Sequence, residues 1–159
     1  ITNLAIFSSV IHVGANPPLI GILFRPLSVP RHTYNNIKET GCFTINHINK
    51  KIYKQAHQTS LKYLENISEF EECNLTPEYS KTLSAPYVKE SNIKFGCKFL
   101  EEYLIKSNNT VFLVGEIMEV IIPDNTLNRD GYIDIENGET VTISSLDSYH
   151  ETIRIERLL

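Results

Sequence analysis

The sequence predicts a mainly β domain with antiparallel strands and a few short helices. Apolar residues recur in strand-like runs along most of the chain, whereas helix signals are confined to short stretches. The two longest runs, 93–105 and 110–122, are separated by Ser107, Asn108 and Asn109, which favour a turn. We therefore expect an antiparallel hairpin here. The lengths of these strands and the turn between them favour a curled, barrel-like sheet over a parallel one.

Length and composition fit one domain that spans residues 1–159. Hydrophobic residues make up 42% and charged residues 21% of the chain, which is ordinary globular usage. A net charge of −4 argues against nucleic acid and against an anionic membrane surface as partners. No apolar run approaches the roughly 20 residues that a membrane span needs.

The spacing of cysteines and histidines predicts neither a disulfide framework nor a metal site. Cys42, Cys73 and Cys97 are odd in number, widely spaced and form no C-x-x-C pair. The histidines show no metal-ligand spacing either. Free thiols are typical of reducing compartments, so we expect a cytoplasmic protein without a bound metal.

The N-terminal region contains two apolar runs, 1–10 and 16–26, which we expect to form two buried strands joined by an irregular loop. Ser8 and Ser9 lie in the first run, where a strand should pack. Their hydroxyl and backbone N–H groups must be satisfied within the protein or face a ligand. The chain begins in this run without a methionine, so we expect it to be truncated at its front.

Short helices and a strand follow. Thr33 as N-cap and Gly41 as the stop predict a short helix. Alternating residues then predict a strand over 42–48, and residues 50–60 predict a second helix. The polar end of this second helix is expected to open onto a pocket.

The pattern is broken over residues 61–90, which is too long for a plain linker. Helical turns are expected at 68–72 and 76–79, the latter because a proline follows a capping threonine. Residues 85–88 predict a short extended piece.

The C-terminal third is rich in strands. Gly115, inside the second long strand, predicts a bulge or a close backbone approach. Residues 124–126 predict a short turn, and 140–146 a last strand. The residues after it are expected to form a surface tail.

A set of polar residues lies in apolar surroundings along the chain. Two arginines near hydroxyl groups fit a phosphate site, since arginine offers a bidentate fork and helix ends add N–H donors. Helix caps and strand-end hydrogen bonds are the alternative role, which the residues alone favour. The set comprises Ser8, Ser9, Arg25, Arg31, Thr33, Asn46, Thr59 and Ser60.

Nucleotide-binding and hydrolase motifs such as G-x-x-x-x-G-K-[ST], G-x-G-x-x-G and G-x-S-x-G are absent from the sequence. Other short motifs occur together in one order: Asn3-Leu-Ala-Ile-Phe-Ser-Ser9, Asn16-Pro-Pro-Leu-Ile-Gly21, Pro30-Arg-His-Thr33, Phe43-Thr-Ile-Asn46 and Gln55-Ala-His-Gln-Thr-Ser60. In this order and spacing, the chain resembles the flavin reductase-like family of FMN-binding proteins. The resemblance covers nearly the whole chain and implies a Greek-key, antiparallel split β-barrel.

The resemblance also implies a cofactor site and an assembly. FMN would contact Ser8 and Ser9, with its phosphate near Arg31, His32 and Thr33; Thr59 and Ser60 are weaker candidates. Members of the family are generally homodimers with the flavin near the subunit interface. The front that precedes this chain would hold the first helix and strand of the family pattern.

One departure bears on the electron donor. Many family members that use NAD(P)H carry Gly-Asp-His in the late strand, where this chain has Gly115, Glu116 and Ile117. NAD(P)H is therefore a possible donor that the sequence does not establish. Residues 147–150 resemble the Tyr-His end of a subgroup, in which His150 would approach the flavin as a proton donor. Three functions remain open: an NAD(P)H:flavin oxidoreductase, an FMN enzyme that reduces another small molecule, and a non-catalytic flavin carrier.

Overall fold

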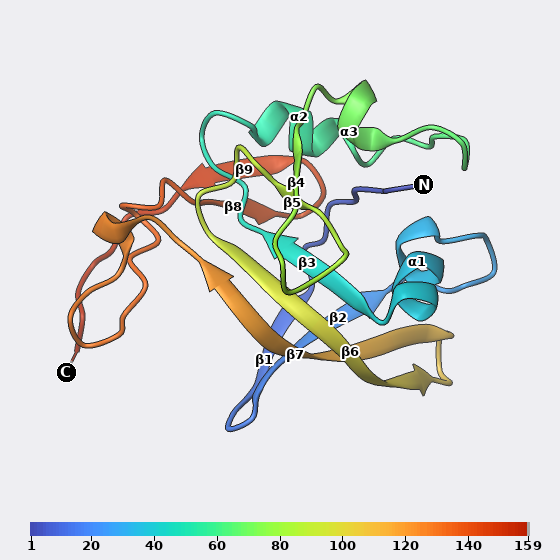
Figure 1. Ribbon diagram of the computed structural model, residues 1–159, viewed down its shortest axis with the longest axis horizontal. Coiled ribbons are helices and arrows are strands. Elements are labelled where there is room, and N and C mark those ends of the chain that lie inside the picture. The colour runs from blue at the N-terminus through green and yellow to red at the C-terminus, as the bar shows by residue number, and fades with distance from the viewer. Residues whose placement is uncertain (159) are drawn as a thin grey trace.

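Five strands form the main sheet in the order β1-β2-β7-β6-β3, and every neighbouring pair is antiparallel. The computed structural model describes residues 1–158. The long strands β6 and β7 curve across the centre of the sheet, and the helices lie at its edges (Figure 1). This arrangement confirms the predicted mainly β, antiparallel architecture. The strands are β1 (Val10–Ala15), β2 (Pro18–Phe24), β3 (Cys42–Asn46), β6 (Lys94–Ile105) and β7 (Thr110–Ile121).

The first strand lies later in the chain than the sequence predicts. β1 covers residues expected to be a loop, and it pairs with β2 through a tight turn, with a register shift between His12 and Gly14. Residues 1–9 contain no strand, although Leu23 N donates to Ser9 O over 3.1 Å. The predicted strand over 1–10 is wrong because the adjacent hairpin already fills the free edge of β2. Pro17 lies in the turn and Pro18 at a strand start, positions that tolerate a missing N–H.

Two helices flank β3. α1 (His32–Thr40) ends as predicted at Gly41, whose positive φ of 71° suits glycine and whose N–H donates to Ile37 O. Thr33 is not its N-cap, because the helix begins at His32 and Arg31 occupies the cap position without a side-chain bond. α2 (Tyr53–Gln58) is shorter than the predicted 50–60.

The segment 61–90 holds a short helix and a two-stranded sheet. α3 (Glu69–Glu72) confirms the helical turn expected at 68–72. The turn expected at 76–79 is wrong: β4 (Pro77–Glu78) pairs with β5 (Tyr87–Val88). Lys89 N donates to Thr76 O, so this backbone bonds across to another strand instead of along a helix.

The β6–β7 hairpin confirms the predicted antiparallel pair of long strands. Both outcomes expected near Gly115 occur: the pairing shifts register between Phe99 and Glu101, opposite Gly115 and Val114. A Cβ on Gly115 would lie only 2.6 Å from the Phe43 ring, so glycine allows this ring to pack directly on the backbone of β7.

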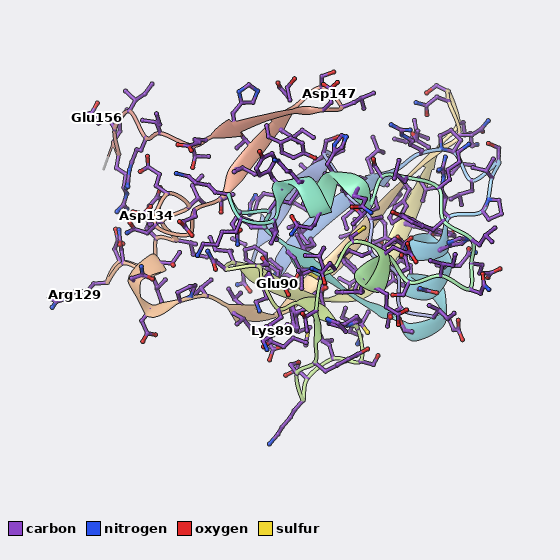
Figure 2. The ribbon with its side chains drawn as sticks, turned by 90° about the horizontal axis from the view of Figure 1, so that it is seen from above. Lys89, Glu90, Arg129, Asp134, Asp147 and Glu156 are labelled. Atoms are coloured by element: carbon purple, nitrogen blue, oxygen red, sulfur yellow. The ribbon has the colours of Figure 1, made fainter. Side chains whose placement is uncertain are left out.

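The C-terminal residues form more structure than the expected tail. After η1 (Asp124–Thr126), β8 (Val141–Ser144) and β9 (Ser148–Glu151) make an antiparallel hairpin. The tail prediction is therefore wrong for 148–151, which pair with the strand predicted before them. Beyond β9, Arg154 Nη2 donates to Asp134 Oδ2 over 2.9 Å and to Glu136 Oε2 over 2.7 Å. Figure 2 shows Asp134 below this hairpin and Asp147 at its turn.

Two apolar clusters hold these elements together. One joins the sheet to α1, and the other joins α2, α3 and β5. The first consists of Ile22, Phe24, Ile37, Phe43, Cys97, Val111 and Leu113, and the second of Ile52, Phe70, Cys73, Leu75 and Val88. No helix within residues 1–158 is long and apolar enough to cross a membrane.

Candidate functional site

One groove collects every residue that the resemblance assigns to flavin binding. Its volume is about 840 Å³, within the range of small-molecule sites. The residues come from three separate segments: the N-terminal segment, the start of α1 and the end of α2. They are Ser8, Ser9, Arg31, His32, Thr33, Thr59 and Ser60.

The remaining walls come from the end of β2, the loop after α2 and the turn between β8 and β9. These walls add the cations Arg25 and Lys62. The β8–β9 turn adds the Asp147 carboxylate and the apolar side chain of Leu146, which is largely exposed. The groove thus combines positive charge, hydroxyl groups and apolar surface.

The positive charges of the groove are available for a ligand. Arg31 uses its Nε to donate to Pro26 O over 3.4 Å. Across residues 1–158, none of the ion pairs involves Arg31, Arg25 or Lys62. The terminal N–H groups of a guanidinium can form two parallel bonds to phosphate oxygens, so the donor set fits a phosphate-bearing ligand.

Some hydroxyl groups of the groove already form hydrogen bonds within the protein, and others do not. Thr59 is buried, and its Oγ1 donates to Ala56 O over 2.7 Å, so it acts as a helix-end residue. Thr33 Oγ1 donates to Asn3 Oδ1 over 2.5 Å. Among the described residues, Ser8, Ser9 and Ser60 form no side-chain hydrogen bond within the protein, and these three hydroxyls remain open to a ligand.

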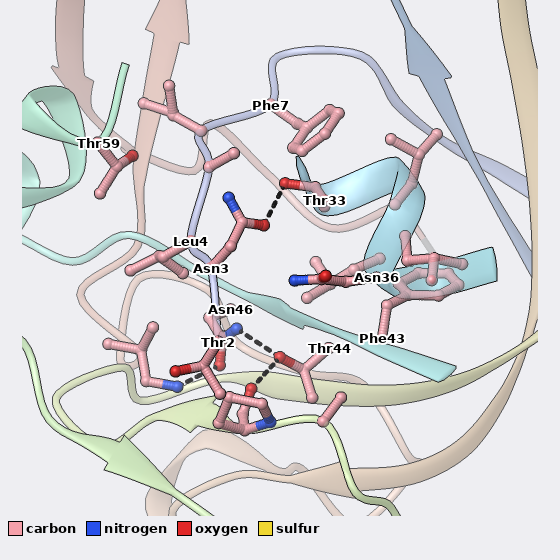
Figure 3. A pocket seen from close by; sticks show the side chains of 18 of the residues that line it. Thr2, Asn3, Leu4, Phe7, Thr33, Asn36, Phe43, Thr44, Asn46 and Thr59 are labelled. Atoms are coloured by element: carbon pink, nitrogen blue, oxygen red, sulfur yellow. Dashed lines mark hydrogen bonds between the residues drawn. The ribbon is translucent and has the colours of Figure 1, made fainter. Parts of the chain in front are cut away.

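A buried carboxylate that the sequence reasoning missed holds the N-terminal wall. Glu69 accepts from Leu4 N over 3.0 Å and from Asn3 Nδ2 over 3.3 Å, and its side chain is almost fully buried. Asn3 Oδ1 in turn accepts from Thr33 Oγ1 (Figure 3). The Asn3 amide therefore bridges Glu69 of α3 to α1. A single glutamate in an irregular region belongs to no sequence motif. Only the three-dimensional structure shows that Glu69 binds the N-terminal segment.

His57 and Tyr149 form a second feature that the sequence reasoning missed. His57 lines the groove, and its Nδ1 lies 3.1 Å from the hydroxyl of Tyr149 on β9. The neighbouring candidate proton donor, His150, does not line the groove. Its Nε2 lies 2.7 Å from Ser144 Oγ, across the β8–β9 hairpin. Strand alternation explains the difference, because successive residues face opposite sides.

A second cavity of about 390 Å³ lies against the N-terminal segment, α1 and β3 (Figure 3). It shares six lining residues with the groove: Asn3, Ala5, Ile6, Phe7, Thr33 and Thr59. Most of its other lining is apolar, including Ile37, so it suits a charged ligand less well than the groove does.

The described part of the chain holds no group of three or more histidine, cysteine or acidic residues that could bind a metal ion. Its titratable groups with large pKa changes lie outside the groove. Burial raises the pKa of Cys97 to about 12, which makes this thiol inert at neutral pH. The geometry of the groove therefore offers ligand binding and positioning.

Comparison with known proteins relates this geometry to other chains. The sequence profile of the Flavin reductase like domain matches residues 2–138. A candidate flavin reductase with a split-barrel domain from Shewanella frigidimarina is 50% identical, with a TM-score of 0.94. The similarity covers 99% of this chain and 78% of that one.

Two further proteins extend the comparison. Nitrilotriacetate monooxygenase component B from Bacillus cereus is 25% identical with a TM-score of 0.86, over 98% of this chain and 79% of that one. An uncharacterised protein of Halalkalibacterium halodurans is 29% identical over 166 residues, covering 99% of this chain and 79% of the relative. These similarities confirm the split-barrel fold predicted from the sequence.

Proposed function

Because this chain belongs to the flavin reductase-like family, we propose that it binds FMN in the groove and transfers electrons or hydride through it. One observation carries the proposal: the guanidinium of Arg31, without an ion pair in residues 1–158, faces the same groove as the free hydroxyls of Ser8, Ser9 and Ser60. FMN combines a phosphate, a hydroxylated chain and a flat ring system, so it needs this mixture of donors and apolar surface.

The flavin supplies the redox chemistry, and the protein supplies position and electrostatics. Arg31 and His32 hold the phosphate in this proposal, and Ser8 and Ser9 bind along the chain and ring. Glu69 and Asn3 fix the wall on which these serines lie. Hydride arrival at a flavin requires no general base, and among residues 1–158 the hydroxyls of Ser8, Ser9 and Ser60 form no hydrogen bond to a histidine.

The name of the Shewanella protein favours the first of the three candidate functions, an NAD(P)H:flavin oxidoreductase. The similarity to nitrilotriacetate monooxygenase component B also supports an oxidoreductase role, because a monooxygenase is an oxidoreductase. This chain has Glu116 and Ile117 after Gly115 in place of the Asp-His of many family members that use NAD(P)H. The use of NAD(P)H is therefore part of the proposal. The proposed protein is a homodimer, and its proposed location is the cytoplasm.

Purified protein should bind added FMN, or carry it from expression with a flavin absorption spectrum. Equilibrium dialysis measures the affinity, and a colourless protein without measurable affinity contradicts the proposal. Rapid mixing of the FMN-loaded protein with NADH or NADPH then separates the candidate functions. Fast bleaching supports an NAD(P)H:flavin oxidoreductase. Without bleaching, reduction of small acceptors by chemically reduced protein distinguishes an enzyme from a carrier.

A further inference from the structure

Tyr149 and His57 lie far apart in sequence and meet at one wall of the groove. The Tyr149 hydroxyl lies 3.1 Å from His57 Nδ1, and the two rings meet edge to face with centroids 5.7 Å apart. His57 lies in α2, two residues before Thr59, and lines the groove. The contact therefore ties the β8–β9 hairpin to the part of α2 that borders the ligand site.

Several contacts fix the position of Tyr149. Its ring packs on Tyr53, with centroids 5.6 Å apart. At the end of β9, Glu151 forms an ion pair with Lys50 over 3.2 Å. The Tyr149 side chain is half-buried, so its hydroxyl has a defined direction toward the imidazole.

This geometry selects one tautomer of His57. Burial, and secondly the Asp147 carboxylate, raises the pKa of Tyr149, so its hydroxyl keeps its proton at neutral pH. A neutral imidazole has one nitrogen that accepts and one that donates. A phenol donates better than it accepts, because its oxygen lone pairs are delocalised into the ring. Tyr149 therefore donates to Nδ1, and the proton of the imidazole resides on Nε2.

We propose that His57 binds the ligand in the groove, donating its Nε2–H to an oxygen or nitrogen atom of the FMN ring system, and that Tyr149 is its positioning residue. The inference rests on the proposed FMN function. With the phosphate at Arg31 and His32, the ring extends toward other walls of the groove. There His57 and Ser60 offer N–H and O–H donors beside the apolar side chains of Ile143 and Leu146.

A neutral N–H donor at this place has a chemical consequence. It stabilises negative charge that accumulates on the ring when it is reduced, because a fixed donor needs no reorganisation. His57 should therefore favour the reduced over the oxidised ligand. Loss of the donor should shift the midpoint potential of the bound flavin to a more negative value.

The tautomer can be tested without any ligand. Long-range ¹H–¹⁵N NMR spectra of the histidine rings should show His57 as the Nε2–H form in the wild type. Tyr149→Phe keeps the aromatic ring and removes the hydroxyl, so His57 should become a mixture of tautomers. A wild-type spectrum with the proton on Nδ1 overturns the inference.

The ligand contact is tested by flavin binding. His57→Asn should weaken FMN about tenfold, as expected for one hydrogen bond, and should shift the potential. Tyr149→Phe should weaken FMN less, and should add nothing in the His57→Asn background. His150→Asn is the matched control, because His150 bonds Ser144 outside the groove. If His57→Asn does not fold, Tyr149→Phe alone carries the test.

The outcomes separate the two proposals. A wild-type protein that binds no FMN overturns the proposed function and this inference together. Wild-type FMN binding with unchanged affinity and potential in His57→Asn overturns the inference alone. If Tyr149→Phe lowers the thermal stability but leaves the FMN affinity unchanged, Tyr149 has only a structural role. This outcome also contradicts the inference.

Discussion

Arg31 provides the most specific residue-level test of the groove. Its alanine variant should weaken FMN by about 10- to 100-fold, because hydrogen bonds to a charged group contribute roughly 1.5–3 kcal/mol. Riboflavin lacks the phosphate, so its affinity should change little. Fluorescence titration with both flavins measures the difference. Arg129→Ala, in an exposed loop outside the groove, is the control (Figure 2). Equal losses for both flavins would make Arg31 a structural residue.

His47 should make the fold sensitive to acid. Burial lowers its pKa below the ordinary 6.5, and its Nδ1 lies 3.1 Å from Thr140 Oγ1. The unfolded chain then binds more protons than the folded one, so stability falls as the pH drops from about 6.5 through the folded-state pKa. Urea midpoints at pH 7 and pH 5 measure this loss. His47→Gln keeps a polar partner for Thr140, and its urea midpoint should fall less between pH 7 and pH 5 than that of the wild type. An equal fall would mean that other groups cause the acid sensitivity.

The residues of the site were predictable only in part. Ser8, Ser9, Arg31 and Ser60 were assigned through the order of motifs, and the groove gathers them. Their individual patterns favoured ordinary caps, and Thr59 does behave as one. Glu69 and His57 were not assigned, because their partners lie more than 60 residues away in the chain. A single-residue pattern carries no information about such contacts.

At the level of elements, Gly115 lets the Phe43 ring of β3 pack against the backbone of β7. Gly115→Ala should destabilise the fold by about 1–3 kcal/mol, because its Cβ would overlap the Phe43 ring and lie 3.2 Å from Lys98 O. Gly14→Ala is the control, since its nearest atom, Pro17 O, would lie at an ordinary 3.6 Å. Urea unfolding measures both. A Gly115 variant as stable as the wild type would mean that the aromatic ring moves aside freely.

Local patterns predicted elements well where neighbours in sequence decide the structure. The β6–β7 hairpin and the end of α1 at Gly41 follow from alternation and from turn and cap chemistry. The strand over 1–10 and the helical turn at 76–79 failed because pairing decided them. β2 pairs with residues 10–15 instead of with the predicted strand. Pro77–Glu78 pairs with β5 instead of forming a helical turn.

For the whole molecule, the family resemblance predicts a homodimer. Large apolar side chains are exposed on the sheet, among them Ile11 on β1, Tyr103 on β6 and Met118 on β7. Such surface is typical of interfaces. Sedimentation equilibrium should give twice the 18.2 kDa mass of one chain. A single-chain mass at tens of micromolar protein would contradict the prediction.

The N-terminal wall has a consequence for exchange with solvent. Within residues 1–158, the amides of 2–7 form no strand ladder, and Leu4 N–H is held by the Glu69 side chain. These amides should exchange hydrogen for deuterium far faster than those of β6 and β7, since local opening breaks few bonds. A ligand in the groove should slow them selectively. Hydrogen exchange of the peptide that contains residues 2–7, followed by mass spectrometry, therefore measures ligand binding in the groove. This measurement requires neither flavin absorbance nor catalytic turnover.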